Sequence, residues 1–300
     1  MEATQVHDRA TFHAERQRMI GGSDAPAVVG LSPFKGAYQV WAEKVGRVPP
    51  DELEGEHLEL GTVIEPYISG KYERLNPGRK VIGARDLPGA GLCMHATWPW
   101  MGCHLDAEIH GDPRGVGVLQ IKSTGFDDEE WARGAPDHVT IQTQHEMECR
   151  GASWGVIGVL FGAPLLHTRF IEIDKNQELI DLVMDAEASL WRLVETGTEP
   201  PARGIDLGAL KRMYPNVLDV EEVDLPPEAA QWDADYARGA AIEKDGRRIK
   251  DDAKAELLRA IGAKGRGKLP GGGFWRRKLI EKDSYTVAPS AYVDLRKVKG

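Results

Sequence analysis

The sequence has few cysteines and no long apolar run. Its 300 residues include three cysteines, Cys93, Cys103 and Cys149, which are scattered along the chain. This pattern argues against a disulfide framework and against a zinc or iron–sulfur cluster, and it favours a reducing, cytoplasmic location. No stretch approaches the roughly 20 apolar residues of a membrane span, and the polar N-terminal residues contain no signal-peptide core. We therefore expect no association with a membrane.

The chain also lacks the net positive charge that is typical of nucleic-acid-binding proteins, because its formal net charge is −9 at pH 7. The charges are unevenly distributed, however. Residues 241–300 carry 16 Lys and Arg against 8 Asp and Glu, whereas the first 240 residues carry 22 against 39. In the basic segment, Phe274 and Trp275 stand beside several cations. Such a segment is either a solvated helical tail or an electrostatic contact to phosphates.

The pattern of apolar residues predicts a mixed α/β (α+β) architecture. A Gly-rich turn precedes a short helix, with Ser23 and Asp24 at its N-terminal cap. Helical apolar spacing predicts helices over 37–47, 57–76, 135–150 and 176–196. Alternating apolar residues predict strands near 79–85, 91–97, 101–110, 115–123, 154–161 and 167–173. The turn HGDPRG joins two of these strands into a hairpin.

Gly and Pro residues in TGTEPPARG mark the end of the region with this pattern. We expect a core domain over residues 1–204 and a basic C-terminal appendage over residues 205–300. The appendage is expected to be helical first, with two helices over 226–262, and β-rich last, with a small strand pair over 271–300.

The hairpin carries the most informative polar residues. Residues two apart on a strand point to the same face, so Gln120 and Lys122 of GVGVLQIKST project side by side from an otherwise apolar strand. Asp106 lies on the preceding strand, and antiparallel neighbours are about 5 Å apart. Oxygen ligands of this kind suit Mg²⁺, and a nearby lysine can stabilise charge that builds on a phosphate. Taken alone, the spacing is explained more often by chance or by a buried ion pair.

Two other polar positions have meaning only together with this hairpin. Glu65 lies just before Pro66 on an otherwise apolar helical face, where an unpaired carboxylate is unfavourable, although a half-exposed Glu is an equal alternative. Gln142 and Gln144 lie among apolar residues of HVTIQTQHEMEC, on a helix that can cover the active edge of the sheet.

Five motifs in order resemble those of the YqaJ-like viral recombinase family, which is similar to phage lambda exonuclease within the PD-(D/E)XK nuclease superfamily. They are RQRMIGGSDAPAVVGLSPF, GTVIE, HLDAEI, LQIKST and IQTQHEM. The resemblance covers about residues 10–200. It implies a restriction-endonuclease-like core with a central mixed β-sheet flanked by helices. It also implies Mg²⁺-dependent degradation of one strand of linear duplex DNA from the 5′ end, with Mn²⁺ as a substitute, in a phage or bacterial host cell.

The resemblance assigns roles to single residues. Asp106 matches the central metal-ligating aspartate, and Glu65 matches the helix acid that touches the metal directly or through water. Lys122 matches the catalytic lysine. Gln142 matches the glutamine that supports the attacking water or the metal ligands.

A second group matches the residues that hold a 5′-phosphate. These are Ser23 and Arg16, with Arg18 as a near alternative to Arg16. A hydroxyl and backbone amides at a helix N-terminus also suit an anion on physical grounds. The partners that the resemblance implies are double-stranded DNA ends and a single-strand annealing protein. Because processive members of the family close into rings around DNA, a homo-oligomeric ring is a further expectation.

Gln120 departs from the family pattern, because it stands where the second acidic metal ligand is found. An amide oxygen can ligate Mg²⁺, but this replacement removes one negative charge from the site. Glu108, two residues after Asp106 on the same strand face, is the candidate metal ligand that restores the charge. Two alternatives remain: an endonuclease on the same core, and a catalytically weakened protein that binds DNA in recombination.

Overall fold

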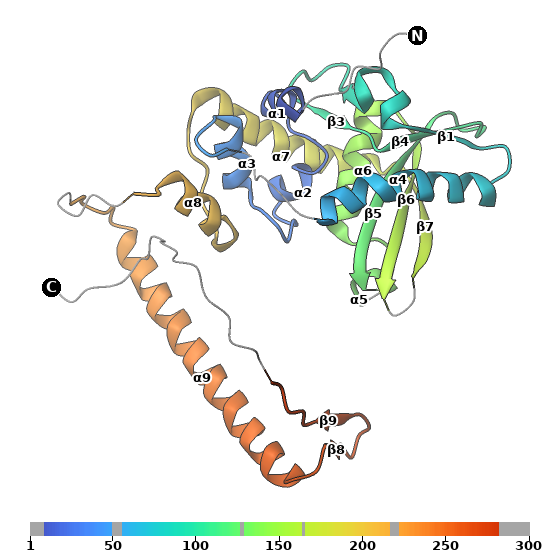
Figure 1. Cartoon of the computed structure of the whole chain (residues 1–300). Helices are drawn as coiled ribbons and strands as arrows, with labels where there is room; N and C mark the ends of the chain where they lie inside the picture. Colours follow the sequence, from blue (N-terminus) through green and yellow to red (C-terminus); the bar gives the residue numbers. More distant parts are fainter. Residues whose placement is uncertain (1–8, 50–55, 127–128, 164–165, 217–221, 282–300) are drawn as a thin grey trace. The chain divides into compact units, whose positions relative to one another are not determined.

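The computed structural model describes residues 9–49, 56–126, 129–163, 166–216 and 222–281 (Figure 1). The chain divides into two compact units, Met1–Pro215 and Asn216–Gly300. Helix α8 (Leu207–Met213) belongs to the first unit, where the Sδ of Met213 accepts a hydrogen bond from Tyr38. The domain boundary expected after residue 204 stays a prediction. None of the helices in the described ranges has an apolar stretch that would cross a membrane.

A five-stranded mixed sheet forms the centre of the first unit, which confirms the α/β class predicted from the sequence. The strands, in spatial order, are β1 (Lys80–Gly83), β4 (Ala107–His110), β5 (Gly117–Phe126), β6 (Trp154–Ala163) and β7 (His167–Asp174). Strands β5 and β6 run parallel, and the other neighbours are antiparallel. The predicted hairpin is the β4–β5 pair. Strands β2 (Leu92–Met94) and β3 (Gly102–His104) form a separate antiparallel pair.

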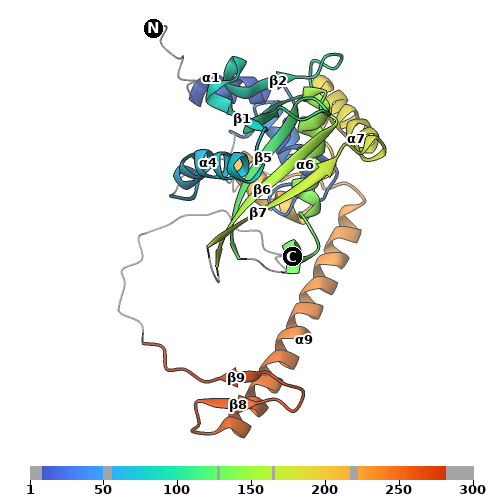
Figure 2. The same cartoon turned by 90° about the vertical axis from the view of Figure 1, so that its right-hand side faces the viewer.

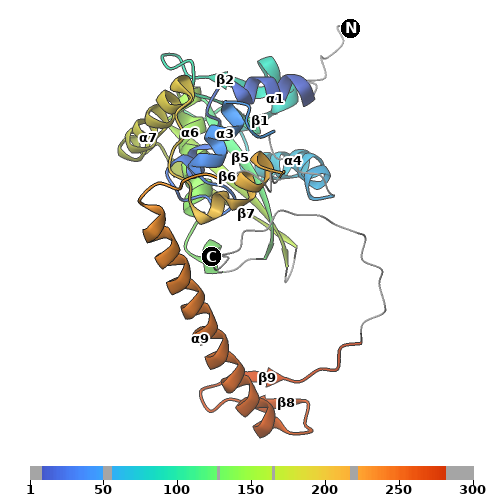
Figure 3. The same ribbon diagram turned by 90° about the vertical axis from the view of Figure 1, so that its left-hand side faces the viewer.

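Helices cover both faces of this sheet (Figures 2 and 3). Helix α4 (Glu56–Leu75) packs on one face through Ile64, Ile68 and Tyr72. Helix α6 (Asp137–Arg150) covers the opposite face, and α7 (Gln177–Thr196) packs over α6. The shorter helical segments of this unit are α1 (Arg9–Gln17), α2 (Ala25–Val28), α3 (Ala37–Lys44), η1 (Ala84–Asp86), η2 (Pro88–Gly91), α5 (Glu129–Ala132) and η3 (Gly204–Asp206).

The side chains of β5 alternate between these two faces. Leu119 and Ile121 pack in the cluster that includes Ile68 of α4. Val118 packs with Met147 of α6 on the other face. Since side chains alternate along a strand, the residues two and four after Val118 also face α6. These residues are Gln120 and Lys122, so the structure places them on one face, as predicted.

The strand expected over 101–110 is divided in two, which corrects that prediction. Strand β3 ends at His104 and β4 begins at Ala107. The ladder between β4 and β5 begins at the pair Ala107–Leu119. Two residues further along β5, the backbone N–H of Ile121 donates to the carboxylate of Asp106 instead of a carbonyl. The break in the strand therefore turns the Asp106 side chain toward β5.

In the second unit, a single helix, α9 (Ala229–Ile261), replaces the two helices expected over 226–262. Each interior glycine weakens a helix by about 1 kcal/mol without breaking it. Ion pairs at helical spacing support it, including Arg248–Asp252 and Arg259–Glu256. Strands β8 (Arg266–Lys268) and β9 (Phe274–Arg276) pair antiparallel. This pair begins earlier than the one expected over 271–300, of which residues 282–300 lie outside the described residues.

Candidate functional site

Hydrogen bonds join four of the predicted site residues on the α6 face of the sheet. The Nε2 of Gln120 donates to Asp106 Oδ2 over 2.6 Å. The Nε2 of Gln142 donates to Gln120 Oε1 over 3.1 Å, and Lys122 Nζ donates to Gln142 Oε1 over 2.8 Å. Asp106, Gln120, Gln142 and Lys122, called here the Asp106 chain, therefore form one connected group.

Asp106 is held in place from the backbone as well. The N–H of Ile121 donates to Asp106 Oδ2 over 2.7 Å. Burial raises the pKa of Asp106, and the Lys122 ammonium, the Ile121 N–H and the Gln120 amide only partly oppose this shift. The site therefore holds a carboxylate whose negative charge the protein neutralises incompletely.

Glu65 faces the same site from α4, on the other side of the sheet. Its side chain is half-buried. Burial raises the pKa of Glu65 to about 7, with repulsion from Asp106 acting in the same direction and Arg85 against it. Glu65 lines a cleft of about 740 Å³ together with Lys122, Gln142 and Ser23. The structure thus brings Glu65 to the edge where the Asp106 chain lies.

Glu146 is a site residue that the sequence analysis missed. It follows Gln142 by one helical turn on α6, and the Nε2 of Gln142 donates to Glu146 Oε1 over 2.9 Å. The residue is 1% exposed. Burial, followed by repulsion from Asp106, raises the pKa of Glu146 to about 8. The sequence signal was its spacing of four from Gln142, because residues four apart share a helix face.

Glu108 lies on the same strand face but is engaged elsewhere. Its carboxylate accepts from Arg150 Nε, and its Oε2 lies 2.9 Å from His110 Nε2. Burial alone would raise the pKa of Glu108, but Arg150 and His110 hold it lower than usual. Among the described side chains, no hydrogen bond joins Glu108 to the Asp106 chain.

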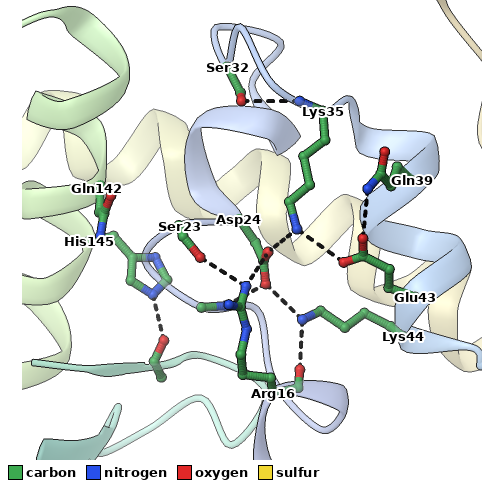
Figure 4. Close-up of polar contacts among 12 residues, drawn as sticks. Arg16, Ser23, Asp24, Ser32, Lys35, Gln39, Glu43, Lys44, Gln142 and His145 are labelled. Atoms are coloured by element: carbon green, nitrogen blue, oxygen red, sulfur yellow. Dashed lines mark hydrogen bonds and ion pairs between the residues drawn. The ribbon is translucent and has the colours of Figure 1, made fainter. Parts of the chain in front are cut away.

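Ser23 and Arg16, which the resemblance assigns to a 5′-phosphate site, lie together (Figure 4). The guanidinium of Arg16 donates to Ser23 Oγ over 2.9 Å and to Asp24 Oδ1 over 3.0 Å. Lys35 and Lys44 each donate to the same Asp24 carboxylate over 2.7 Å. Asp24 is fully buried. Burial alone would raise the pKa of Asp24, but Lys35, Lys44 and Arg16 hold it well below its usual range.

These three cations border a cavity of about 600 Å³ that also contains Ser23 and Ser32 in its wall. Asp24 and Glu43 neutralise two of the three positive charges, which leaves a net positive pocket suited to an anion. Ser23 and Ser32 also line the cleft of Glu65 and Lys122. The positive pocket and the cleft therefore adjoin.

The donors at the Asp106 chain fit Mg²⁺ bound through few protein ligands. Within the described ranges, no three His, Cys, Asp or Glu side chains gather closely enough to form a metal cage. Mg²⁺ accepts hard oxygen ligands and keeps several waters, so one or two carboxylates and an amide oxygen suffice. The Oε2 of Glu146 is buried and has no hydrogen-bond partner in the described part of the chain. A cation would satisfy such an oxygen.

The fold and the arrangement of these residues define a restriction-endonuclease-like core. Residues 11–153 match the YqaJ-like viral recombinase domain. This part of the chain is therefore similar to that family, in agreement with the order of its motifs.

The uncharacterized protein YqaJ of Bacillus subtilis (strain 168) is 27% identical over 220 residues, which are 70% of this chain and 65% of that protein. The chain thus matches slightly less than two thirds of that relative. The crystal structure of LHK-Exo in complex with dAMP is 18% identical, covers 68% of this chain and 99% of its own, and has a TM-score of 0.50. A second crystal structure, an alkaline exonuclease (LHK-Exo) from Laribacter hongkongensis, is 18% identical and has a TM-score of 0.49. The match covers 63% of this chain and 94% of that one. The first of these two structures shares the fold of this chain.

Proposed function

We propose that the protein is a Mg²⁺-dependent DNA exonuclease that degrades one strand of linear duplex DNA from the 5′ end. The observation that carries this proposal is that the cleft lined by Glu65, Lys122 and Gln142 adjoins the positive pocket of Arg16 and Ser23. A nuclease that starts at a DNA end needs both a hydrolytic site and a pocket for the terminal phosphate. The family and the fold shared with a structure named for an exonuclease support the same activity.

In this proposal Asp106, Gln120 and Glu65 contribute to metal binding. When bound, Mg²⁺, or Mn²⁺ in its place, polarises the scissile phosphate and makes water a stronger nucleophile near neutral pH. Lys122 supplies a fixed positive charge where negative charge builds on the phosphate. Gln142 orients both Lys122 and Gln120, because its carbonyl oxygen accepts from Lys122 and its amide donates to Gln120.

The proposed activity predicts a dependence on the 5′-phosphate. Linear duplex with a 5′-phosphate should be digested with a KM roughly 10–100-fold lower than the same duplex without it, since a charge-assisted hydrogen bond contributes about 1.5–3 kcal/mol. Replacing Arg16 by Gln should remove this difference. Initial rates at several DNA concentrations measure it.

Arg18→Gln serves as the matched control, because Arg18 is exposed and it is Arg16 that donates to Ser23. Equal KM values for both ends in the wild-type protein would contradict the 5′-phosphate assignment. Closed circular duplex decides between the two kinds of nuclease: cutting of circles would select an endonuclease on the same core. DNA binding without cleavage in Mg²⁺ or Mn²⁺ would select the weakened binding protein.

The proposed function also includes partners. Double-stranded DNA ends are the substrate, and a single-strand annealing protein would receive the strand that remains. A homo-oligomeric ring would keep the enzyme on its substrate. The acidic first 240 residues suit a ring with a negative outer surface and a locally basic channel. The cytoplasm of a bacterial or phage-infected cell is the proposed location.

In the second unit, a basic groove is a proposed binding surface for DNA phosphates. Arg247, Lys250 and Lys254 line it from one face of α9, together with Trp275 and Arg276.

Replacing Arg247, Lys250 and Lys254 by Gln in the full chain should flatten the plot of log affinity against log salt by about 0.9 for each phosphate that is no longer neutralised. Fluorescence anisotropy with duplex DNA measures this slope. Lys244→Gln, on α9 but outside the groove, should leave it unchanged, and an unchanged slope in the triple variant would identify a merely solvated helix.

A further inference from the structure

Helix α6 presents a polar stripe to the sheet, formed by Gln142, Glu146 and Arg150. Residues four apart lie on one face of a helix. At one end of the stripe Gln142 accepts from Lys122, and at the other end Arg150 donates to Glu108. Glu146 lies between them, and no cation in the described part of the chain forms an ion pair with it. The stripe thus contains one carboxylate that no cation of the described residues pairs with directly.

This carboxylate is buried as well as unpaired. Glu146 is 1% exposed, and its Oε1 accepts from Gln142 while its Oε2 has no hydrogen-bond partner among the described residues. A buried carboxylate without a partner is strongly unfavourable unless something neutralises it. The side chain therefore has the properties of a ligand whose cation the protein does not itself supply.

The N-terminal turn is shaped to accommodate this side chain. A Cβ atom at Gly22 would lie 2.8 Å from Glu146 Oε1 and 3.0 Å from Glu146 Cγ. Contacts that close mean that a side chain at position 22 would displace Glu146 from its observed position. Because Ser23 follows directly, the turn that carries the proposed phosphate pocket also closes over Glu146.

Glu146 is one hydrogen-bonded residue away from Gln120. The Nε2 of Gln142 donates both to Gln120 Oε1 and to Glu146 Oε1. Gln120 is neutral, and its own amide group donates to Asp106. The acidic group that is absent from β5 at Gln120 is thus present on α6 at Glu146, and Gln142 lies between the two side chains.

We propose that Glu146 is the acidic metal ligand that replaces the carboxylate absent at Gln120. The inference rests on the proposed nuclease function and adds which side chain holds the cation. Carboxylate oxygens are the ligands that Mg²⁺ prefers, and a second negative charge near Asp106 strengthens its binding. Glu108, the candidate from the sequence, has Arg150 and His110 as partners instead.

The test measures Mg²⁺ binding by the full chain without DNA, using isothermal titration calorimetry and Mn²⁺ titrations followed by electron paramagnetic resonance. Glu146→Gln is expected to weaken binding at least about tenfold. The matched control is Glu148→Gln on the same helix, where Lys175 pairs with the carboxylate over 2.6 Å, and it should bind as the wild type does. Adding Gln120→Glu to Glu146→Gln should restore binding, because the strand then carries the acid again.

Equal Mg²⁺ affinity of the wild type and Glu146→Gln would overturn the proposal. So would a failure of Gln120→Glu to restore binding, or a tenfold loss in Glu108→Gln with none in Glu146→Gln. Thermal melting separates binding from folding: in EDTA the Tm of Glu146→Gln should not fall, because the substitution removes a buried acid whose Oε2 has no hydrogen-bond partner among the described residues. The rise in Tm on adding Mg²⁺ should shrink in the same variant.

The two proposals fail in different ways. A wild-type protein that binds Mg²⁺ through Glu146 but digests no DNA would refute the proposed nuclease function and support the assignment of Glu146. A different result would be digestion that depends on Mg²⁺ while Glu146→Gln changes neither the digestion nor the Mg²⁺ affinity. That result would support the nuclease function and overturn the assignment of Glu146.

Discussion

Replacing Lys122 by Met should lower the rate of Mg²⁺-dependent digestion of linear duplex DNA about 10²–10³-fold, the loss expected when one fixed charge at a developing anion is removed. Met preserves the apolar stem of Lys122 on β5 but removes the ammonium, whose Nζ donates to Gln142 Oε1 over 2.8 Å. Because the charge acts on the transition state, kcat should fall while KM changes little. Single-turnover digestion of 5′-phosphorylated duplex measures the rate.

Lys175→Met is the matched control for this variant. Lys175 pairs with Glu148, away from the residues that line the cleft, so its replacement should leave the rate near that of the wild type. A loss of similar size in both variants would point to a general effect on folding or DNA affinity. An unchanged rate in Lys122→Met would refute the catalytic role of Lys122.

The sequence predicts best those site residues whose relation depends on the alternation of side chains along one strand. Alternation along β5 places Gln120 and Lys122 on one face, because that relation needs only two residues of strand. The hairpin brings Asp106 near them for the same local reason. The hydrogen bond from Gln120 to Asp106 shows that this short-range geometry is realised.

The features of the site that the sequence did not predict depend on contacts with residues from distant parts of the chain. The sequence places Glu108 on the same strand face as Asp106, but Arg150 on α6 pairs with its carboxylate. Glu146 reads as an ordinary polar helix residue, because its burial depends on α6 lying under the turn at Gly22. Such contacts join segments that no local pattern connects.

Asp24 was predicted at the correct position, but its interactions also depend on residues that are distant in the sequence. It is the N-terminal cap of α2, as the sequence indicated, yet its side chain makes no capping hydrogen bond to that helix. Its carboxylate instead accepts from Arg16, Lys35 and Lys44, which come from α1, the following loop and α3. Cap preference predicts the residue type, whereas tertiary packing determines what the carboxylate does.

Asp24→Asn should therefore destabilise the first unit more than any surface substitution. Removing one partner of a buried ion pair costs about 3–5 kcal/mol, because the other charge stays buried and unpaired. For a domain of this size the loss corresponds to a fall in Tm of roughly 6–20 °C. Asp174→Asn, at a side chain that is 88% exposed, should change stability by less than about 0.5 kcal/mol. Melting followed by circular dichroism makes the comparison.

The pH dependence identifies the cause of this loss. Lys35, Lys44 and Arg16 depress the pKa of Asp24 in the folded protein, so their stabilising effect is complete above the pKa of the unfolded chain, about 3.9. As the pH falls through the range between the two pKa values, protons bind the unfolded chain first. The difference in unfolding free energy between wild type and Asp24→Asn should then shrink by up to about 1.4 kcal/mol per pH unit.

Urea unfolding of both proteins between pH 7 and pH 3 measures this difference. It should be constant above about pH 5 and decrease below pH 4, because the asparagine has no proton to gain. A difference that stays constant down to pH 3 would attribute the loss to packing and not to charge. Since Arg16 reaches Ser23 while bound to Asp24, the same variant should also lose part of its preference for 5′-phosphorylated ends, which links the buried ion cluster to the phosphate pocket.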